Sequence, residues 1–304
     1  MEIKKAALVG FGAIGCVYAK NFIKSIGDDF VVIAGGSRAE RIRSKGVIVN
    51  GEEVKPRVVE PENTDYKADL IIFTVKNYHL AQALNDVKNI VTENTVFLTV
   101  LNGVTARDEI KEAYPNNTVL YGIGMGIDAV RNDEGIKCKC EGTIQFGDAD
   151  NTVMSTEVKA VKDLFDKAGI GNEVFPDMIR TIWNKFMINV STNQLSAITG
   201  CGYGSFLTVP ELNEAMHQVM TEVITLANKK GINLKEDDAY AYEKKLATFD
   251  PVGKTSMLQD VEAKRHTEVD YFAGTVIKFG KEAGVPTPWN DRMYLLIKTI
   301  ESLY

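Results

Sequence analysis

A polar stripe that includes one lysine runs through an otherwise apolar segment of the chain, WNKFMINVSTN. Lys185, Asn189 and Asn193 recur at every fourth residue, so a helix would carry them on one face. Burial lowers the pKa of a lysine toward neutrality, which suits a general acid. The lysine charge can also stabilise the alkoxide that develops when a hydride reaches a carbonyl carbon. The segment therefore predicts a lined cleft with acid chemistry; a solvent-facing stripe is the alternative.

A glycine-rich turn near the N-terminus, AALVGFGAIGCVYAK, has the pattern G-x-G-x-x-G. Gly10 permits a tight turn, Gly12 lets the backbone approach a pyrophosphate, and Gly15 lets a helix pack against the preceding strand. The amino end of that helix offers free N–H groups to phosphates. We predict that this segment binds a dinucleotide rather than being a bare strand-to-helix turn. The predicted cofactor-binding residues of the turn are Gly10, Phe11, Gly12, Ala13, Ile14 and Gly15.

The end of the second apolar run, VVIAGGSRAERIR, indicates which dinucleotide. An NAD site usually has Asp or Glu there to bind the ribose hydroxyls, but positions 34–38 contain no acid. Ser37 and Arg38 are present instead, and a guanidinium can bind a 2′-phosphate by charge-assisted hydrogen bonds. We therefore predict NADPH/NADP+ as the cofactor in preference to NAD(H). The alternative is that the arginines only decorate a solvated helix, as we expect for Arg43.

Two further candidate site residues, Ser256 and Glu268, lie in the segment KTSMLQDVEAKRHTEVDYFAG. Ser256 followed by Gln259 also fits a capping box, so helix capping is an alternative role for the serine. In one continuous helix, Ser256 and Glu268 would lie about 120° apart and line different parts of a cleft. Glu268 could equally be a surface ion-pair partner of Lys264 or Arg265.

Histidine and metal chemistry have little support in this sequence. By sequence alone, none of His79, His217 and His266 is paired with a carboxylate. The four cysteines form no C-x-x-C pair and no metal-ligand set with the histidines. We therefore predict no metal site, and free thiols of the kind that a reducing cytoplasm maintains.

The first half of the chain must position the glycine-rich turn, and it alternates apolar runs with helix-like stretches. Strands are predicted at 6–11, 30–35, 69–75 and 95–101, followed by 119–130 and 142–148. Their weak alternation of polarity is typical of parallel strands buried on both faces. The order of elements predicts an α/β domain with a doubly wound parallel sheet. Asn102 follows the fourth run, at the carboxyl end of a strand, where such sheets bind ligands.

The second half must position the lysine, and it shows helix periodicity almost throughout. Long helices are predicted at 178–200, 209–231, 256–284 and 288–304. We therefore expect a cofactor-binding domain at 1–175 and an all-α domain at 176–304 that serves the substrate and dimerisation.

Composition narrows the function classes. The 304 residues carry a net charge of -6, which argues against a nucleic-acid-binding protein, since those are generally basic. No apolar run approaches the roughly 20 residues that a bilayer span needs. The short apolar segment after MEIKK leads into the glycine-rich turn rather than a cleavage site. We expect a cytoplasmic protein with neither a nucleic-acid nor a membrane partner.

Along its whole length the chain resembles the ketopantoate reductases (2-dehydropantoate 2-reductases). The resemblance is carried by GFGAIG, FTVKNYH, LNG, NKFMINVSTNQLSAITG, TSMLQDVEAKRHTEVDYFAG and AGVPTPWNDRMYLLI. It implies a Rossmann-type domain that binds NADPH, a helical C-terminal domain, and an active site in the cleft between them. The implied reaction reduces the 2-oxo acid 2-dehydropantoate to (R)-pantoate, in pantothenate and coenzyme A biosynthesis, by a monomer or homodimer.

The resemblance also implies roles for individual residues. Lys185 would protonate the substrate carbonyl oxygen, and Glu268 would meet cofactor and substrate hydroxyls. The other matched positions are the substrate-binding Asn189, Asn193 and Ser256, and the cofactor-side Lys76 and Asn102.

Two positions depart from the family pattern, both on the substrate side. Tyr203 stands where some members have asparagine, and Gly253 where some have a polar residue. A related reductase of another branched 2-oxo acid is therefore an alternative. A β-hydroxyacid dehydrogenase and a non-catalytic NADPH sensor are further alternatives.

Overall fold

The chain folds into two compact units. The structure, a computed structural model, describes residues 1–304, and its units are Met1–Met178 and Ile179–Tyr304. The boundary expected from the sequence lay at residue 175. Each unit is described by itself below.

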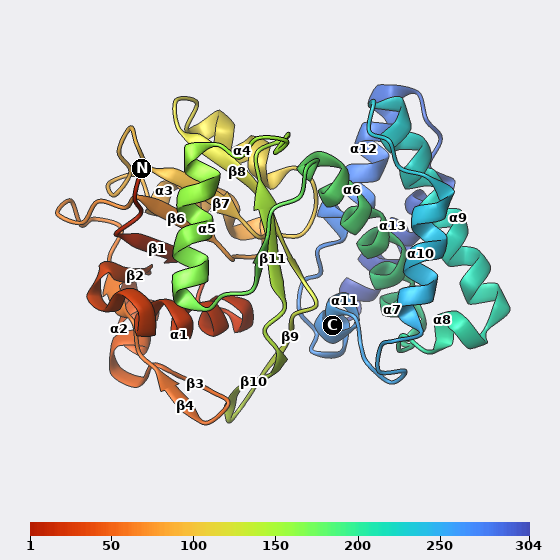
Figure 1. Cartoon of the computed structure of the whole chain (residues 1–304). Coiled ribbons are helices and arrows are strands. Elements are labelled where there is room, and N and C mark those ends of the chain that lie inside the picture. The colour runs from red at the N-terminus through yellow and green to blue at the C-terminus, as the bar shows by residue number, and fades with distance from the viewer. The chain divides into compact units, whose positions relative to one another are not determined.

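The N-terminal unit is built on an eight-stranded sheet with the order β12-β11-β8-β7-β6-β1-β2-β5 (Figure 1). Neighbouring strands are parallel except β8 and β11, which are antiparallel. The parallel doubly wound prediction is confirmed, with this one antiparallel pair added. The strands are β1 Ala6–Val9, β2 Phe30–Ile33, β5 Arg57–Val59, β6 Leu70–Phe73, β7 Val96–Thr99, β8 Thr118–Met125, β11 Thr143–Gly147 and β12 Asn172–Glu173.

Helices cover both faces of this sheet because its strands are apolar on both faces. Leu8 and Ile72 belong to a core that includes α1 and α5, whereas Val9 and Phe73 belong to a second core with α3 and α4. Figure 1 shows α1 and α5 in front of the strands. The helices of this unit are α1 Ala13–Ile26, α2 Gly36–Lys45, α3 Leu80–Asp86, α4 Ala106–Ala113 and α5 Thr156–Ala168.

The strand order fixes where this sheet can bind a ligand. From β5 through β2, β1, β6 and β7 to β8, the order is that of the dinucleotide-binding sheet, 3-2-1-4-5-6. The order in which successive strands join the sheet therefore reverses between β1 and β6. Ligands of such sheets bind at this point, outside the carboxyl ends of the strands.

A second, four-stranded sheet with the order β4-β3-β10-β9 was not predicted. It joins two hairpins that are far apart in the sequence, and the Asn50 side chain links them by bonding the backbone N–H and C=O of Cys138, both at 2.8 Å. The short strands are mostly exposed, so they lack the apolar runs that mark the main sheet. They are β3 Val47–Val49, β4 Glu52–Val54, β9 Asp128–Asn132 and β10 Gly135–Cys140.

The C-terminal unit consists of helices (Figure 1). The first predicted helix is confirmed and ends at Gly200, which adopts the left-handed conformation. Residues 189–193 within it are π-helical. The elements are α6 Met178–Ile188, the π-helical Asn189–Asn193, α7 Gln194–Thr199, α8 Ser205–Thr208, α9 Pro210–Lys229, α10 Glu236–Leu246, α11 Ser256–Glu262, α12 Ala273–Ala283 and α13 Pro288–Glu301.

The prediction of one continuous helix over 256–284 was wrong. After α11 the chain turns at Lys264, whose φ is 50°, and the Arg265 N–H donates to the Asp260 carbonyl at 2.9 Å. Glu268 lies in the connecting segment before α12, and the expected 120° relation to Ser256 does not apply. No glycine or proline lies between Ser256 and Ala273 to mark this break in the sequence.

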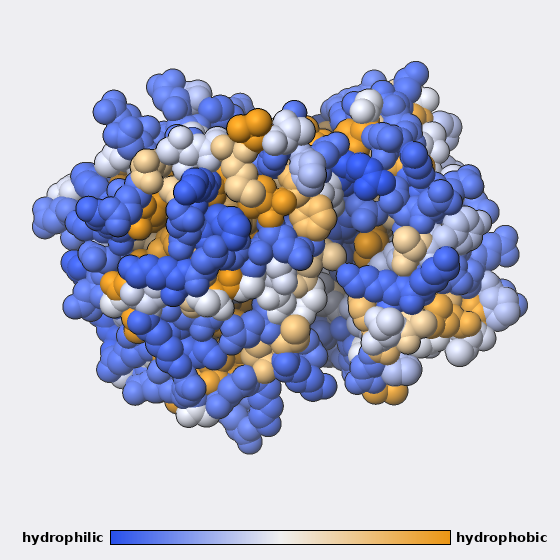
Figure 2. Space-filling view, viewed as in Figure 1, coloured by the Kyte–Doolittle hydropathy of each residue, from blue (hydrophilic) through white to orange (hydrophobic).

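The surface shown in Figure 2 is largely hydrophilic, with hydrophobic residues in small groups. None of the helices combines the length and the apolar character that crossing a membrane requires.

Candidate functional site

The glycine-rich turn has the geometry that its sequence predicts. Gly10 has a φ of 110°, a conformation that favours glycine. A Cβ at Gly15 would collide with the Gly10 carbonyl oxygen, so α1 can approach β1 only with glycine there. A Cβ at Gly12 would meet nothing within 4 Å, and Gly12 is exposed. The turn thus leaves open space beside the amino end of α1, which fits a pyrophosphate.

Thr74 supports this turn and was not predicted. Its hydroxyl donates to the Gly10 carbonyl at 2.6 Å, and its N–H donates to the Val9 carbonyl at 2.8 Å. Thr74 directly follows β6, so it connects β6 to β1, the two strands between which the strand order reverses. The only feature of the sequence that could have indicated this role of Thr74 is a hydroxyl side chain directly after a buried strand.

Lys76 and Asn102 lie near the same edge of the sheet, as predicted. Lys76 follows β6 and Asn102 follows the neighbouring strand β7. The Asn77 side chain joins the two segments by donating to the Asn102 carbonyl at 2.9 Å. The candidate cofactor residues after β1, β6 and β7 therefore share the carboxyl edge of three adjacent strands.

Ser37 and Arg38 lie in the first turn of α2, just beyond β2, and both are exposed. Although Arg38 is exposed, partial enclosure of its guanidinium and the charge of Arg41 lower its pKa. Arg43, on the same helix, forms an ion pair with Glu60 at 2.6 Å, consistent with a surface role. Arg38 and Arg43 therefore differ in environment, although they are only five residues apart on one helix.

Lys185 and Glu268 interact within the C-terminal unit. Burial lowers the pKa of Lys185 to about 8, and the negative charge of Glu268 acts in the opposite direction. Glu268 is only 4% exposed, so its interpretation as a surface ion-pair residue is wrong. Arg265 instead pairs with Asp260 at 3.0 Å. A lysine with this pKa can exchange its proton near neutral pH.

Asn193 and Ser256 also meet within this unit. The Asn193 amide donates to the Ser256 hydroxyl at 3.4 Å. The capping role considered for Ser256 is wrong, because the Thr255 hydroxyl caps α11 by accepting from the Leu258 N–H at 3.2 Å. The exposed Ser256 is therefore available for another role.

The π-helical segment affects how the lysine–asparagine stripe aligns. In a regular α-helix, residues eight apart are rotated by about 80° from each other. The π-helical turn from Asn189 to Asn193 winds less per residue and so reduces the offset between Lys185 and Asn193. Asn189 begins this segment and is half-buried. The equal spacing of the stripe did not predict this local winding.

The two departures from the family pattern pack against each other. The Tyr203 N–H donates to the Gly253 carbonyl at 3.0 Å. A Cβ at Gly253 would lie 3.1 Å from the Tyr203 ring and 2.9 Å from the Asp250 carbonyl oxygen. Glycine at 253 therefore makes room for tyrosine at 203, whose ring also contacts Phe249 edge-on.

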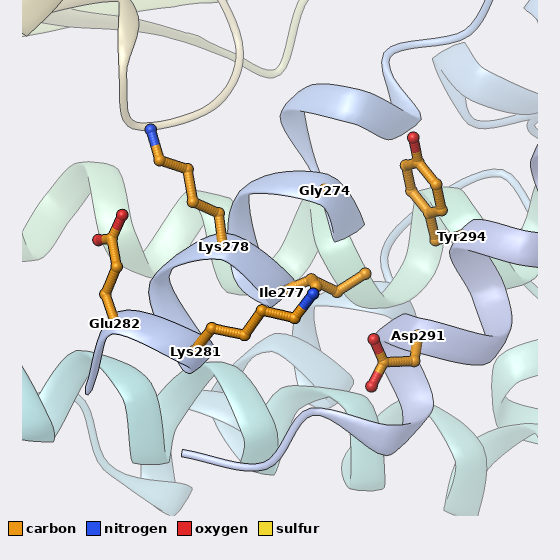
Figure 3. Close-up of a pocket in the computed structure, with 7 residues that line it drawn as sticks. All are labelled: Gly274, Ile277, Lys278, Lys281, Glu282, Asp291 and Tyr294. Atoms are coloured by element: carbon orange, nitrogen blue, oxygen red, sulfur yellow. The ribbon is translucent and has the colours of Figure 1, made fainter. Parts of the chain in front are cut away.

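Two other features lie apart from the predicted residues. His217 bonds Glu243 at 2.9 Å across α9 and α10, a pairing that sequence alone did not reveal. A groove between α12 and α13 contains none of the predicted site residues (Figure 3). Its lining residues are Gly274, Ile277, Lys278, Lys281, Glu282, Asp291 and Tyr294. Both charge signs occur in this groove, so it has no clear preference for a charged ligand.

Comparison with known proteins places the chain in a family. The family model "Ketopantoate reductase PanE/ApbA" matches residues 6–151, and "Ketopantoate reductase PanE/ApbA C terminal" matches residues 177–301. A 2-dehydropantoate 2-reductase of Streptococcus pyogenes is 25% identical over 300 residues, 97% of each chain.

Solved structures share the fold. D-mandelate dehydrogenase, solved with NADH and anilino(oxo)acetate, has a TM-score of 0.88 and 23% identity over 98% of each chain. The 2-dehydropantoate 2-reductase of Methylococcus capsulatus has a TM-score of 0.84 and 24% identity, over 98% of this chain and 96% of that one. With both family models matched and the expected two-part fold present, the chain belongs to the ketopantoate reductase family of oxidoreductases.

Proposed function

We propose that this protein reduces 2-dehydropantoate to (R)-pantoate with NADPH, and so contributes to pantothenate and coenzyme A biosynthesis. The observation that carries the proposal is Lys185, whose pKa burial lowers to about 8 beside the charge of Glu268. A lysine with an ordinary pKa would release its proton much less readily at neutral pH. Family membership and the Streptococcus pyogenes relative support the choice of substrate.

The first unit would bind the cofactor, and residues of the second unit would bind the substrate. The glycine-rich turn binds the pyrophosphate through backbone N–H groups at the amino end of α1. NADPH, when bound, supplies the hydride. Asn193 and Ser256, whose side chains meet at 3.4 Å, would hold the substrate carboxylate by hydrogen bonds, and Asn189 would contribute from the same helix.

Lys185 would donate the proton that the reduction requires. As the 2-carbon gains the hydride, the carbonyl electron pair moves onto oxygen, and that oxygen takes a proton from Lys185 Nζ. The products are a 2-hydroxy acid, oxidised cofactor and neutral lysine, which regains its proton from water. The charge of Glu268 favours the protonated lysine before each turnover.

A second candidate is the reduction of another branched 2-oxo acid. The packing of Tyr203 on Gly253 favours this candidate, because both residues differ from the family pattern. Gly253 lies three residues before Ser256, and Tyr203 contacts Gly253. An aromatic ring in place of an asparagine offers less hydrogen bonding to a hydroxylated substrate.

A panel assay separates the candidates. The purified protein is mixed with NADPH and individual 2-oxo acids, including 2-dehydropantoate, and cofactor oxidation is followed by absorbance. The highest kcat/KM on 2-dehydropantoate supports the first proposal. Turnover of another branched 2-oxo acid in its place supports the second. Absence of turnover across the panel, with NADPH binding intact, rejects both and favours a sensor.

A further inference from the structure

Arg131 reaches the glycine-rich turn from the second sheet. It lies on β9, and its guanidinium donates to the Phe11 carbonyl at 3.2 Å and contacts Cys16 Sγ at 3.6 Å. Phe11 is the second residue of the G-x-G-x-x-G motif, and Cys16 follows its last glycine. The unpredicted small sheet therefore places a cation at the turn that we expect to bind the dinucleotide.

Three guanidinium groups share this region. Desolvation lowers the pKa of Arg38 most, the charges of Arg41 and Arg131 lower it further, and the charge of Asp86 acts in the opposite direction. Burial raises the pKa of the Cys16 thiol to about 12, so Cys16 is neutral and offsets none of this charge. Arg38, Arg41 and Arg131 form no ion pair, since no carboxylate lies within 4 Å of them.

Arg43 provides the contrast on the same helix. Its guanidinium is neutralised by Glu60 at 2.6 Å, whereas those of Arg38 and Arg41 are not. Positive groups that are close together and lack carboxylate partners attract anions. A guanidinium has five donors, so Arg131 retains donors after binding the Phe11 carbonyl.

We propose that Arg131, together with Arg38, binds the 2′-phosphate of NADP(H) and thereby sets the cofactor preference. This inference rests on the proposed use of a dinucleotide by the glycine-rich turn. Arg38 lies in the first turn of α2, beyond β2, where the adenosine ribose of a bound dinucleotide lies in such sheets. Arg131 approaches from the second sheet and is held in place by the turn itself. Two guanidinium groups from different elements can share the oxygens of one phosphate.

A purely structural role makes a different prediction. If Arg131 only fastens β9 to the turn, its loss should weaken NADP+ and NAD+ binding to the same extent. If it binds the 2′-phosphate, only the ligand with that phosphate should lose affinity. The ratio of the two dissociation constants therefore distinguishes the roles.

The experiment measures Kd for NADP+ and NAD+ by calorimetry on the full-length protein and on R131A, R131Q and R43A. R131Q keeps a neutral N–H donor on a shorter side chain but lacks the charge, and it provides a second variant should R131A fail to fold. We expect NADP+ to bind about 10-fold more weakly to both Arg131 variants, as for loss of a charge-assisted hydrogen bond. NAD+ affinity should not change, and R43A should behave like the wild type.

Equal losses for both dinucleotides, or no loss for either, would overturn the inference. Because the assay needs no 2-oxo acid, it can succeed even if the proposed substrate is wrong. Conversely, a reductase that prefers NADH would exclude the role of Arg131 and leave the reaction type intact.

Discussion

At the scale of single residues, we expect the largest effect on catalysis from replacement of Lys185. We expect Lys185→Ala to lower kcat for 2-oxo acid reduction by about 10²-fold, because the carbonyl oxygen loses its proton donor. NADP+ affinity should be retained, since the glycine-rich turn lies in the other unit. Lys278→Ala, an exposed lysine on α12, is the matched control and should leave kcat unchanged. Unchanged turnover in K185A would remove Lys185 from the mechanism.

The pH dependence of the reaction follows from the same side chain. Lys185 has a pKa of about 8 and must be protonated to act as an acid. The rate of reduction should therefore be highest below about pH 8 and fall as pH rises through that value. Oxidation of the hydroxy acid needs neutral lysine, so its rate should rise over the same range. Initial rates in both directions across pH 6 to 10 would measure this.

Glu268 provides the control for that profile. Its negative charge raises the pKa of Lys185, so Glu268→Gln should shift the fall in reduction rate to lower pH. A profile that keeps its midpoint in E268Q would show that another group titrates.

How far sequence can predict such residues depends on the contact involved. Lys185 and Asn193 were accessible because their spacing on one helix is a local property. Thr74 and Arg131 act on the glycine-rich turn from segments that are distant in sequence. No local pattern shows such a contact, so these two residues emerged only from the fold.

At the scale of elements, capping of α11 and substrate binding belong to two neighbouring residues, Thr255 and Ser256, although the sequence suggested both roles for Ser256. Thr255 is buried and caps α11, so Thr255→Ala should lower the free energy of unfolding by about 1 kcal/mol. Ser256→Ala leaves the cap intact and should instead raise KM for the 2-oxo acid. Urea unfolding and steady-state kinetics on both variants would test this division. A larger stability loss in S256A than in T255A would contradict it.

The elements themselves differ in how well sequence predicts them. The buried strands β1, β2, β6 and β7 were predicted because continuous apolar runs are distinctive. The break after α11 was missed because no glycine or proline marks it between Ser256 and Ala273. The hairpins of the second sheet were missed because they are short and half-exposed.

At the scale of the whole molecule, the two units carry separate parts of the proposed chemistry. The turn and its supporting residues Thr74 and Arg131 lie within Met1–Met178, and Lys185, Asn193, Ser256 and Glu268 lie within Ile179–Tyr304. The alternation of strands and helices followed by helices alone predicted this division. It could not predict the strand order, because pairing between β1 and β6 joins residues more than sixty positions apart.

Cofactor binding should consequently protect the first unit from hydrogen exchange more than the second. At a hundredfold excess over its Kd, NADP+ should stabilise the form that binds it by about 2.7 kcal/mol. Because its predicted contacts, from Gly10 to Asn102, lie in the first unit, hydrogen exchange should slow most in β1, α1, β2 and the segments after β6 and β7. Helices α9 and α13 should change least, and they provide the internal control. Protection confined to α9 and α13 would place the dinucleotide elsewhere, and equal slowing throughout would indicate that the two units open only together.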